Sequence, residues 1–330
     1  MKRRGFLLGK FLPPHEGHRF LARTALAMTD ETTALVYSTD AEPIPGALRF
    51  QWMRAMLPDA RVLHLHRNLP QTPEEHPEFW PIWRAAILDL LPEAPTHVFA
   101  SESYVFRLAK ELGATPVLVD PAREAVPVSG SDIMTAPHRR WDFIPAEVRP
   151  HFQKRLTLLG PESVGKTTLA ADLAAAYHTR VMPEYGRTYD VAYKQGKNWR
   201  AADLVQLAQT HRAMREAMQG LAGPLLIEDT DAVQTAVWSA FLIGEVDPAL
   251  LAIERETLAD HYFLLAPDVA WVQDGVRYAG DPAARAFFFE EAVRRLDGLG
   301  AHYEVIRGKD WATRRTGALA AAQRRFPELG

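Results

Sequence analysis

A glycine-rich motif near the middle of the chain restricts the fold more than any other feature. It reads Gly160-Pro161-Glu162-Ser163-Val164-Gly165-Lys166-Thr167 and matches G-x-x-x-x-G-K-[ST]. An apolar run at residues 155–159 precedes it, and a helical pattern at residues 166–177 follows it. This order of strand, glycine turn and helix is that of a P-loop, in which backbone N–H groups and the lysine bind nucleotide phosphates. We therefore predict a P-loop α/β domain; the alternative is a glycine turn that binds nothing.

The motif also predicts which residues contact ATP and its Mg²⁺. The predicted ATP contacts are Gly160, Glu162, Ser163, Val164, Gly165, Lys166, Thr167 and Thr168. Among them, Lys166 is a catalytic candidate that neutralises the β and γ phosphates, and Thr167 is a metal ligand. The apolar run at residues 224–228 leads to Asp229 and Asp231, where a P-loop fold places its Mg²⁺ carboxylate. Both are candidates for that carboxylate: we predict Asp229 as the catalytic carboxylate that holds the metal and Asp231 as a substrate contact, and the base is either Asp229 or Glu184. The alternative, chiefly for Asp231, is a cap on the following helix.

Two further segments of the second half carry candidate substrate residues. Glu184 and Arg187 follow a short run at residues 179–182, at the carboxyl edge of the expected sheet, where ligands bind. We predict Glu184 as the ligand of a substrate hydroxyl or its general base and Arg187 as a phosphate-side cation, against a surface ion pair. Residues 267–277, with Arg285 downstream, are interpreted as a lid that excludes water during phosphoryl transfer, against a polar surface loop.

A second motif lies at the start of the chain and reads Gly9-Lys10-Phe11-Leu12-Pro13-Pro14-His15-Glu16-Gly17-His18. His15 and His18 stand three residues apart, after an apolar run and at the opening of a helical pattern. This arrangement predicts two imidazoles and several backbone N–H groups around one phosphate-sized spot. Half of a metal site is the alternative, but no third ligand is evident at a suitable spacing.

Short apolar runs alternate with helical patterns in both halves, which indicates parallel sheets with crossover helices. The chain has 330 residues, more than a single core usually fills, so two domains are expected. We place the boundary near residues 145–150 and predict domains 1–150 and 151–330. The fold class is therefore α/β with two parallel-sheet domains, the second a P-loop domain. The proline-rich stretch at residues 69–81 is interpreted as a surface loop.

Composition excludes several other classes of protein. No run of about 18 apolar residues could span a bilayer, so we expect no membrane insertion. The short apolar run after Met1-Lys2-Arg3-Arg4 is interpreted as a first strand instead of a secretory leader. The chain has no cysteine, which fits a reducing cytoplasm. With a net charge of −3 and a pI near 6.5, the chain has no overall positive potential that would attract nucleic acid.

The string at residues 9–18 resembles the G-x-F-x-P-x-H-x-G-H signature of nucleotidyltransferases that transfer AMP onto nicotinamide mononucleotide (NMN). Together with the P-loop half, the chain resembles the bifunctional nicotinamide-nucleotide adenylyltransferase and ribosylnicotinamide kinase (NadR-like) family. Further similar segments span nearly the whole chain: Arg49-Phe50-Gln51-Trp52-Met53, Ser101-Glu102-Ser103-Tyr104, Val119-Asp120-Pro121, Val128-Ser129-Gly130-Ser131, Trp141-Asp142-Phe143-Ile144-Pro145, residues 183–187, residues 229–231 and residues 271–277.

The resemblance implies a Rossmann-like adenylyltransferase domain followed by a kinase domain. The second would phosphorylate the 5′-hydroxyl of nicotinamide riboside with ATP and Mg²⁺, and the first would join NMN to AMP, giving NAD and pyrophosphate. The implied ATP contacts of the first domain are Gly9, Lys10, Phe11, His15, His18, Ser129 and Ser131, with both histidines catalytic. The implied riboside contacts include Trp271, which would stack on the nicotinamide ring, Asp274 and Arg277. The sequence does not decide whether the chain forms a homo-oligomer or is coupled to a riboside transporter.

The chain departs from the family pattern in two respects. The second phosphate motif of such adenylyltransferases runs I-S-[SG]-T-x-x-R, and Met134 stands where the arginine is expected. Without that cation the leaving pyrophosphate is less stabilised, by about a hundredfold or more in rate, unless Arg139 or Arg140 compensates. The chain also opens directly on the first strand, so we expect none of the DNA-reading helix-turn-helix that some members carry.

Two other functions compete with NAD salvage. The same folds would serve an adenylyltransferase of the pantetheine-phosphate type fused to another nucleoside kinase, which a substrate panel would separate. Alternatively, the chain would be a regulator that binds NAD and ATP with little turnover, a reading that Met134 favours. The intact Lys166, Thr167 and Asp229 argue against the regulator.

Overall fold

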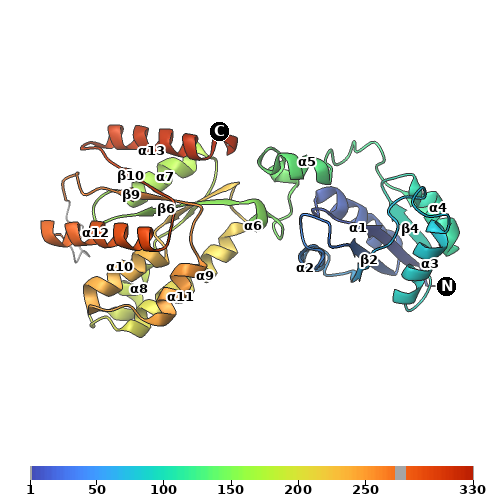
Figure 1. The fold of residues 1–330 in the computed structure, drawn as a ribbon, viewed down its shortest axis with the longest axis horizontal. Coiled ribbons are helices and arrows are strands. Elements are labelled where there is room, and N and C mark those ends of the chain that lie inside the picture. The colour runs from blue at the N-terminus through green and yellow to red at the C-terminus, as the bar shows by residue number, and fades with distance from the viewer. Residues whose placement is uncertain (1, 272–279, 330) are drawn as a thin grey trace. The chain divides into compact units, whose positions relative to one another are not determined.

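The computed structural model describes residues 2–271 and 280–329. The chain separates into two compact units, Met1–Arg149 and Pro150–Gly330. Each unit contains a five-stranded sheet whose strands are all parallel, with helices on both faces (Figure 1). The predicted fold class of two parallel-sheet α/β domains is thereby confirmed. None of the described helices is long and apolar enough to cross a membrane.

The first unit has the strand order β3-β2-β1-β4-β5. Its elements are β1 (Arg4–Gly9), α1 (Glu16–Met28), β2 (Glu31–Ser38), α2 (Gly46–Met56), β3 (Arg61–His66), α3 (Phe79–Leu90), β4 (His97–Ala100), α4 (Tyr104–Leu112), β5 (Thr115–Leu118), α5 (Gly130–Thr135) and the 3₁₀ helix η1 (Pro137–Phe143), with α6 (Arg149–Phe152) at the junction. The chain winds outward from β1 to β3 and then returns to β4 on the other side of β1. This reversal leaves a crevice at the carboxyl ends of β1 and β4, the usual ligand position in such sheets.

Side chains that alternate along β1 fill two separate cores in the first unit. Leu7 packs with α1 and α2 on one face, and Phe6 packs with α3 and α4 on the other. Since successive strand residues point to opposite faces, an apolar strand of this kind is covered by helices on both sides. The sheet is therefore a rigid base for whatever its carboxyl edge binds.

The second unit has the strand order β10-β9-β6-β8-β7. Its elements are β6 (Lys154–Leu159), α7 (Lys166–Ala176), β7 (Val181–Met182), α8 (Gly186–Tyr189), the π-helix η2 (Asp190–Lys194), α9 (Ala201–Gln219), β8 (Leu225–Asp229), α10 (Ala232–Ile243), α11 (Pro248–Glu256), β9 (His261–Leu265), α12 (Pro282–Gly298), β10 (Tyr303–Ile306), α13 (Trp311–Arg325) and the 3₁₀ helix η3 (Pro327–Leu329). Helices α7 and α13 cover one face of the sheet, and α10 and α12 cover the other (Figure 1). The central strand, β6, leads directly into the P-loop.

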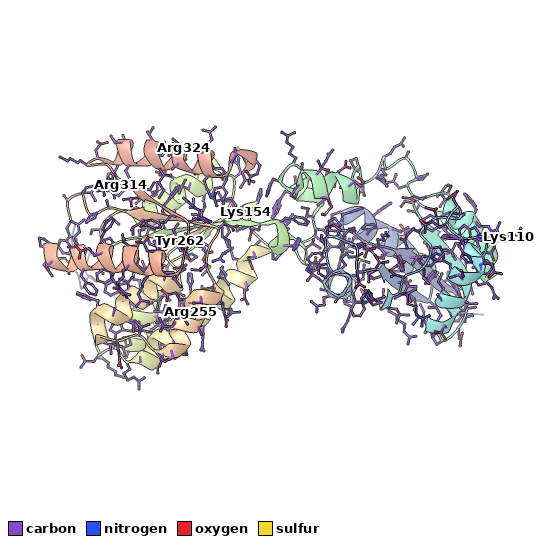
Figure 2. All side chains as sticks on the ribbon, in the orientation of Figure 1. Lys110, Lys154, Arg255, Tyr262, Arg314 and Arg324 are labelled. Atoms are coloured by element: carbon purple, nitrogen blue, oxygen red, sulfur yellow. The ribbon has the colours of Figure 1, made fainter. Side chains whose placement is uncertain are left out.

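Arg314 of α13 is fully buried in the second unit and is labelled in Figure 2. Its guanidinium donates to the carbonyl oxygen of Val164 in the P-loop at 2.7 Å and to that of Ala266, after β9, at 3.0 Å. It also donates to the carboxylate of Asp268 and to the carbonyl oxygen of Gly308. One side chain of the last long helix therefore joins the P-loop to two neighbouring loops.

Two candidate nucleotide sites

The P-loop wraps around the N-terminus of α7 in a conformation that requires glycine. Gly160 and Gly165 have φ values of +141° and +84°, and a Cβ on Gly160 would lie 2.7 Å from the carbonyl oxygen of Leu265. Lys166 Nζ donates to the carbonyl oxygens of Gly160 and Pro161, both at 3.0 Å. The ammonium group therefore lies across the loop that the motif assigns to nucleotide phosphates.

Thr167 and Asp229 form a pair beside the P-loop that fits a magnesium site. Thr167 Oγ1 donates to Asp229 Oδ2 at 2.5 Å, and Asp229 is 1% exposed. The other carboxylate oxygen, Asp229 Oδ1, is buried and makes no hydrogen bond to any described group. A buried carboxylate oxygen without a partner is costly unless a ligand or cation satisfies it. No described cluster of three or more His, Asp or Glu residues offers a site of another kind.

A cavity of about 330 Å³ opens beside this pair and brings the predicted kinase residues together. Those that line it are Glu162, Ser163, Gly165, Lys166, Thr167, Thr168, Glu184 and Arg187. Gly160, Val164 and Asp229 are not among the described lining residues, and the side chain of Val164 is buried in the core against α7. Burial raises the pKa of Glu184 above its usual value, against the opposing charge of Lys166. A carboxylate with a raised pKa in a cavity is suited to accept a proton.

Sequence reasoning missed part of the wall opposite the P-loop. The missed lining residues on α9 and α10 are Leu204, Leu207, His211, Gln234, Thr235, Trp238 and Leu242; Tyr185 and Trp199 complete the aromatic surface. Apart from the adjacent pair Gln234 and Thr235, these positions recur at intervals of three or four residues within each helix, so each helix presents one face. This spacing could have indicated the cavity wall from the sequence, but a helix packed against the core shows the same spacing. His211 is 6% exposed and its Nε2 atom has no partner among the described residues.

Asp231 borders the cavity, but its carboxylate is already bound within the protein. It caps α10 by accepting from Val233 N at 2.9 Å, and it accepts from the hydroxyl of Tyr262 at 2.8 Å. Burial, followed by the charge of Glu228, raises the pKa of Asp231 to about 7. Asp231 is therefore a helix cap in this structure, as the alternative interpretation expects, and because it also lines the cavity its predicted substrate contact stays a prediction.

Of the segment interpreted as a lid, residues 267–277, the structure describes residues 267–271. Asp274 and Arg277 lie outside the described residues. Trp271 packs against Gly280, where a Cβ would fall 2.6 Å from its ring, and it is not among the residues described as lining the cavity. Arg285 donates to the carbonyl oxygen of Val269 at 3.0 Å. The predicted roles of Trp271, Asp274 and Arg277 stay predictions.

In the first unit, His15 and His18 stack at the N-terminus of α1. Their ring centroids are 3.7 Å apart, and the backbone N–H of His15 donates to His18 Nδ1 at 3.2 Å. Burial, followed by the charge of Arg123, lowers the pKa of His15 to about 4. Burial, and then the charges of His15 and Arg123, lower the pKa of His18 well below its usual value. Both rings are therefore neutral near pH 7 and act as hydrogen-bonding groups.

The two phosphate motifs of the first unit meet across a close backbone contact. A Cβ on Gly130 would lie 2.4 Å from the carbonyl oxygen of Leu12, so only glycine fits there. Ser129 caps α5 by accepting from Asp132 N at 3.1 Å. All seven ATP contacts predicted for this half line one cavity of about 590 Å³: Gly9, Lys10, Phe11, His15, His18, Ser129 and Ser131. Arg123 also lines this cavity and was missed, because the similar segment in its loop, Val119-Asp120-Pro121, ends two residues before it.

Acid should destabilise the fold through His15. With a folded pKa of about 4 and an ordinary value of 6.5, the unfolded chain binds a proton that the folded chain excludes between these pH values. The free energy of unfolding should therefore fall as the pH falls from 6.5 to 4, by up to about 1.4 kcal/mol per pH unit from this group. Urea unfolding at several pH values, in wild type and His15→Asn, measures this. The variant should show the shallower slope, and equal slopes would contradict the assignment.

Comparisons with known proteins extend over the whole chain. A family model described as an AAA domain matches residues 155–314. The trifunctional NAD biosynthesis/regulator protein NadR of Escherichia coli (strain K12) is 28% identical, over 94% of this chain and 80% of the relative. The protein of the same name from Salmonella typhimurium is 28% identical, over 93% of this chain and 79% of the relative.

Two solved structures share the complete fold. A NadR protein in complex with NR superposes with a TM-score of 0.78 and 21% identity, covering 98% of this chain and 96% of that one. A NadR protein in complex with NAD and AMP-PNP superposes with a TM-score of 0.77 and 21% identity, covering 99% and 97%. At this identity, the structural likeness shows that the two-unit fold is common to these chains.

Proposed function

Because the chain is a homologue of the NadR proteins over nearly its whole length, we propose that it is an enzyme of NAD salvage with one reaction in each unit. The second unit phosphorylates nicotinamide riboside to NMN, and the first transfers AMP from ATP to NMN. One observation carries this proposal. Lys166, Thr167, Glu184 and Arg187 line one cavity of nucleoside size, whose remaining wall includes the aromatic side chains Tyr185, Trp199 and Trp238.

In the kinase reaction, the P-loop amides and Lys166 hold the β and γ phosphates of ATP. The 5′-oxygen of the riboside bonds to the γ-phosphorus, and Glu184 accepts the proton of that hydroxyl. Burial raises the pKa of Glu184, which suits it to this role. The bond to the β–γ bridging oxygen breaks, and ADP leaves with the electron pair. Arg187, on the same cavity, stabilises charge on the transferring group.

Thr167 and Asp229 are the residues that would hold Mg²⁺. The unpartnered Asp229 Oδ1 and the threonine hydroxyl supply the oxygen ligands that this cation prefers. When bound, the ion neutralises charge that develops on the β and γ phosphates.

In the adenylyl transfer, an oxygen of the NMN phosphate bonds to the α-phosphorus of ATP, and pyrophosphate leaves. His15 and His18, both neutral, donate hydrogen bonds to the phosphates, and Ser129 and Ser131 contact them from the second motif. The buried, stacked rings are fixed before substrate arrives, which is the arrangement that favours transition-state stabilisation.

The direct test is a product assay with the purified chain, Mg²⁺–ATP and nicotinamide riboside, followed by chromatography. Formation of NMN and NAD supports both reactions. NMN alone would limit the proposal to the second unit. With neither product, a panel of other nucleosides and of pantetheine phosphate would test the fusion of different specificity, and binding of NAD and ATP without turnover would favour the regulator.

Trp238 is proposed as a wall for the nicotinamide ring, in the role that sequence analysis gave to Trp271. It lines the cavity and is held edge-on by Phe288, at a centroid distance of 4.4 Å. The cationic pyridinium ring should be attracted to the indole face, so Trp238→Ala should raise KM for the riboside about tenfold. Steady-state NMN formation measures this change.

The matched controls are Trp238→Phe, which keeps an aromatic face, and the neutral dihydro form of the riboside as substrate. The alanine change should affect the cationic substrate more than the neutral one. An equal effect on both would show that Trp238 acts through packing, without a cation–π contribution.

A further inference from the structure

The first unit has no cation at the position where the resemblance requires one. Met134 lies on α5 with 37% of its surface exposed, and it is not among the residues described as lining the cavity. Arg139 and Arg140, in η1, are exposed and do not line it either. The departing pyrophosphate carries several negative charges, so a cavity that releases it should offer a positive group from another element.

Arg123 is a side chain that meets this requirement. It comes from the loop between β5 and α5 and lines the same cavity as both histidines and both serines. Its charge lowers the pKa of His15 and of His18, so its field reaches the two rings proposed to hold phosphate. Lys10 is the other lysine or arginine among the described lining residues, and it pairs with the nearly buried Glu42 at 3.4 Å.

The loop that carries Arg123 is built around a buttressing carboxylate. Asp120 accepts hydrogen bonds from the backbone N–H groups of Glu124 at 2.8 Å, Ala125 at 3.2 Å and Val126 at 3.1 Å. Arg123 N donates to the carbonyl oxygen of Asp120 at 3.0 Å. Asp120 and Arg123 have φ values of +48° and +54°, which non-glycine residues seldom adopt. Backbone with positive φ persists only where neighbouring groups hold it, so the position of the Arg123 backbone at the cavity is fixed.

The guanidinium of Arg123 is also available to an incoming anion. Its nearest carboxylate is that of Glu102, 3.8 Å away, with side chains 44% and 67% exposed. An exposed ion pair at this separation contributes little to stability, so a polyphosphate in the cavity can replace the carboxylate as partner. The planar fork of arginine suits two phosphate oxygens at once.

We propose that Arg123 is the catalytic cation that binds the β and γ phosphates of ATP in the first unit and stabilises the departing pyrophosphate, in place of a side chain at position 134. The proposal rests on the adenylyltransferase function proposed above. As the bond between the α-phosphorus and the α–β bridging oxygen breaks, the electron pair passes to pyrophosphate. Arg123 donates N–H groups to that product and transfers no proton.

The test compares Arg123→Ala with Arg140→Ala, an exposed arginine of the same unit that does not line the cavity. Arg123→Ala should lower the kcat of NAD formation from NMN and ATP about a hundredfold, and Arg140→Ala should not. Product inhibition should separate a direct contact from a structural effect, because the inhibition constant for pyrophosphate should rise about tenfold or more in Arg123→Ala. Adding Met134→Arg to Arg123→Ala should restore part of the rate. NMN formation by the same preparation checks that the second unit is intact.

A binding measurement keeps this proposal separate from the adenylyltransferase function itself. In a Lys166→Ala background, where the P-loop lysine is absent, calorimetry with ATP reports mainly on the first unit. Arg123→Ala should weaken that binding about tenfold or more whether or not wild type forms NAD. If wild type forms no NAD but the arginine dependence of ATP binding remains, the proposed reaction fails and the Arg123 phosphate contact stands. Unchanged ATP affinity and pyrophosphate inhibition in Arg123→Ala, or no ATP binding in the Lys166→Ala background, would overturn the assignment.

Discussion

Replacing Lys166 with alanine should lower kcat/KM for NMN formation about a thousandfold, the largest effect that we expect from a single change. Its ammonium group lies across the P-loop at 3.0 Å from two loop carbonyl oxygens, where the β and γ phosphates are proposed to bind. Loss of a positive charge at that point removes one of the groups that offset the charge of the transferring phosphoryl group. Chromatographic measurement of NMN from nicotinamide riboside and ATP provides the value.

The control for this change is Lys154→Ala. Lys154 is partly exposed, pairs with Asp260 at 3.4 Å and stands at the start of β6, at the end of that strand away from the P-loop. It should retain the wild-type rate. The conversion of NMN to NAD should be unaffected in Lys166→Ala, because the first unit has its own cavity. If Lys166→Ala kept most of its kinase rate, the P-loop would not be the phosphoryl-transfer site.

The second large effect is expected from His18→Ala, which should lower the rate of NAD formation from NMN by a factor on the order of 100 to 1,000. The change removes one proposed phosphate ligand and also the support of a second, because the His18 ring stacks on His15 and meets Phe11 edge-on at 4.8 Å. Steady-state assay of adenylyl transfer measures the effect, with NMN formation as the check on the second unit.

Two further variants are the controls for this result: His18→Asn, which keeps a neutral donor, and His97→Ala, which lies away from the cavity. Asparagine keeps a neutral donor and should retain more activity than alanine, because the pKa of His18 is lowered well below its usual value and no charge is lost. His97 stands at the start of β4, at the opposite edge of the sheet from the cavity, and its replacement should leave adenylyl transfer unchanged. If His18→Ala transferred AMP at the wild-type rate, the phosphate role of the N-terminal motif would be wrong.

The sequence predicted those features in which local pattern and chemistry coincide. The P-loop needs its glycines for backbone geometry and its lysine for charge, so the motif located both the loop and its function. The alternation of strands and helices likewise predicted two parallel sheets. Strand β7 was predicted at residues 179–182 but pairs only at Val181–Met182, because it is a short edge strand.

The features that were missed depend on tertiary arrangement. Trp238 and His211 belong to helices whose apolar faces look like core packing, and only the fold turns those faces toward the P-loop cavity. Arg123 depends on a backbone with positive φ that the carboxylate of Asp120 stabilises. The capping bonds of Asp231 to α10 and its bond to Tyr262 likewise depend on the fold, since the sequence offered a cap and a substrate contact as alternatives.

The buried guanidinium of Arg314 has a consequence for how this chain is altered or tagged. Because it bonds to the carbonyl oxygen of Val164, the geometry of the nucleotide loop depends on a helix nearly 150 residues further along the sequence. The ring of Trp311, at the start of the same helix, occupies the space beside Gly165 that a side chain there would need. A fusion or truncation that displaces α13 should therefore reduce ATP affinity before it unfolds the second unit. Arg314 and Trp311 of α13 thus help to hold the P-loop in its nucleotide-binding conformation, although they lie far from the motif in the sequence.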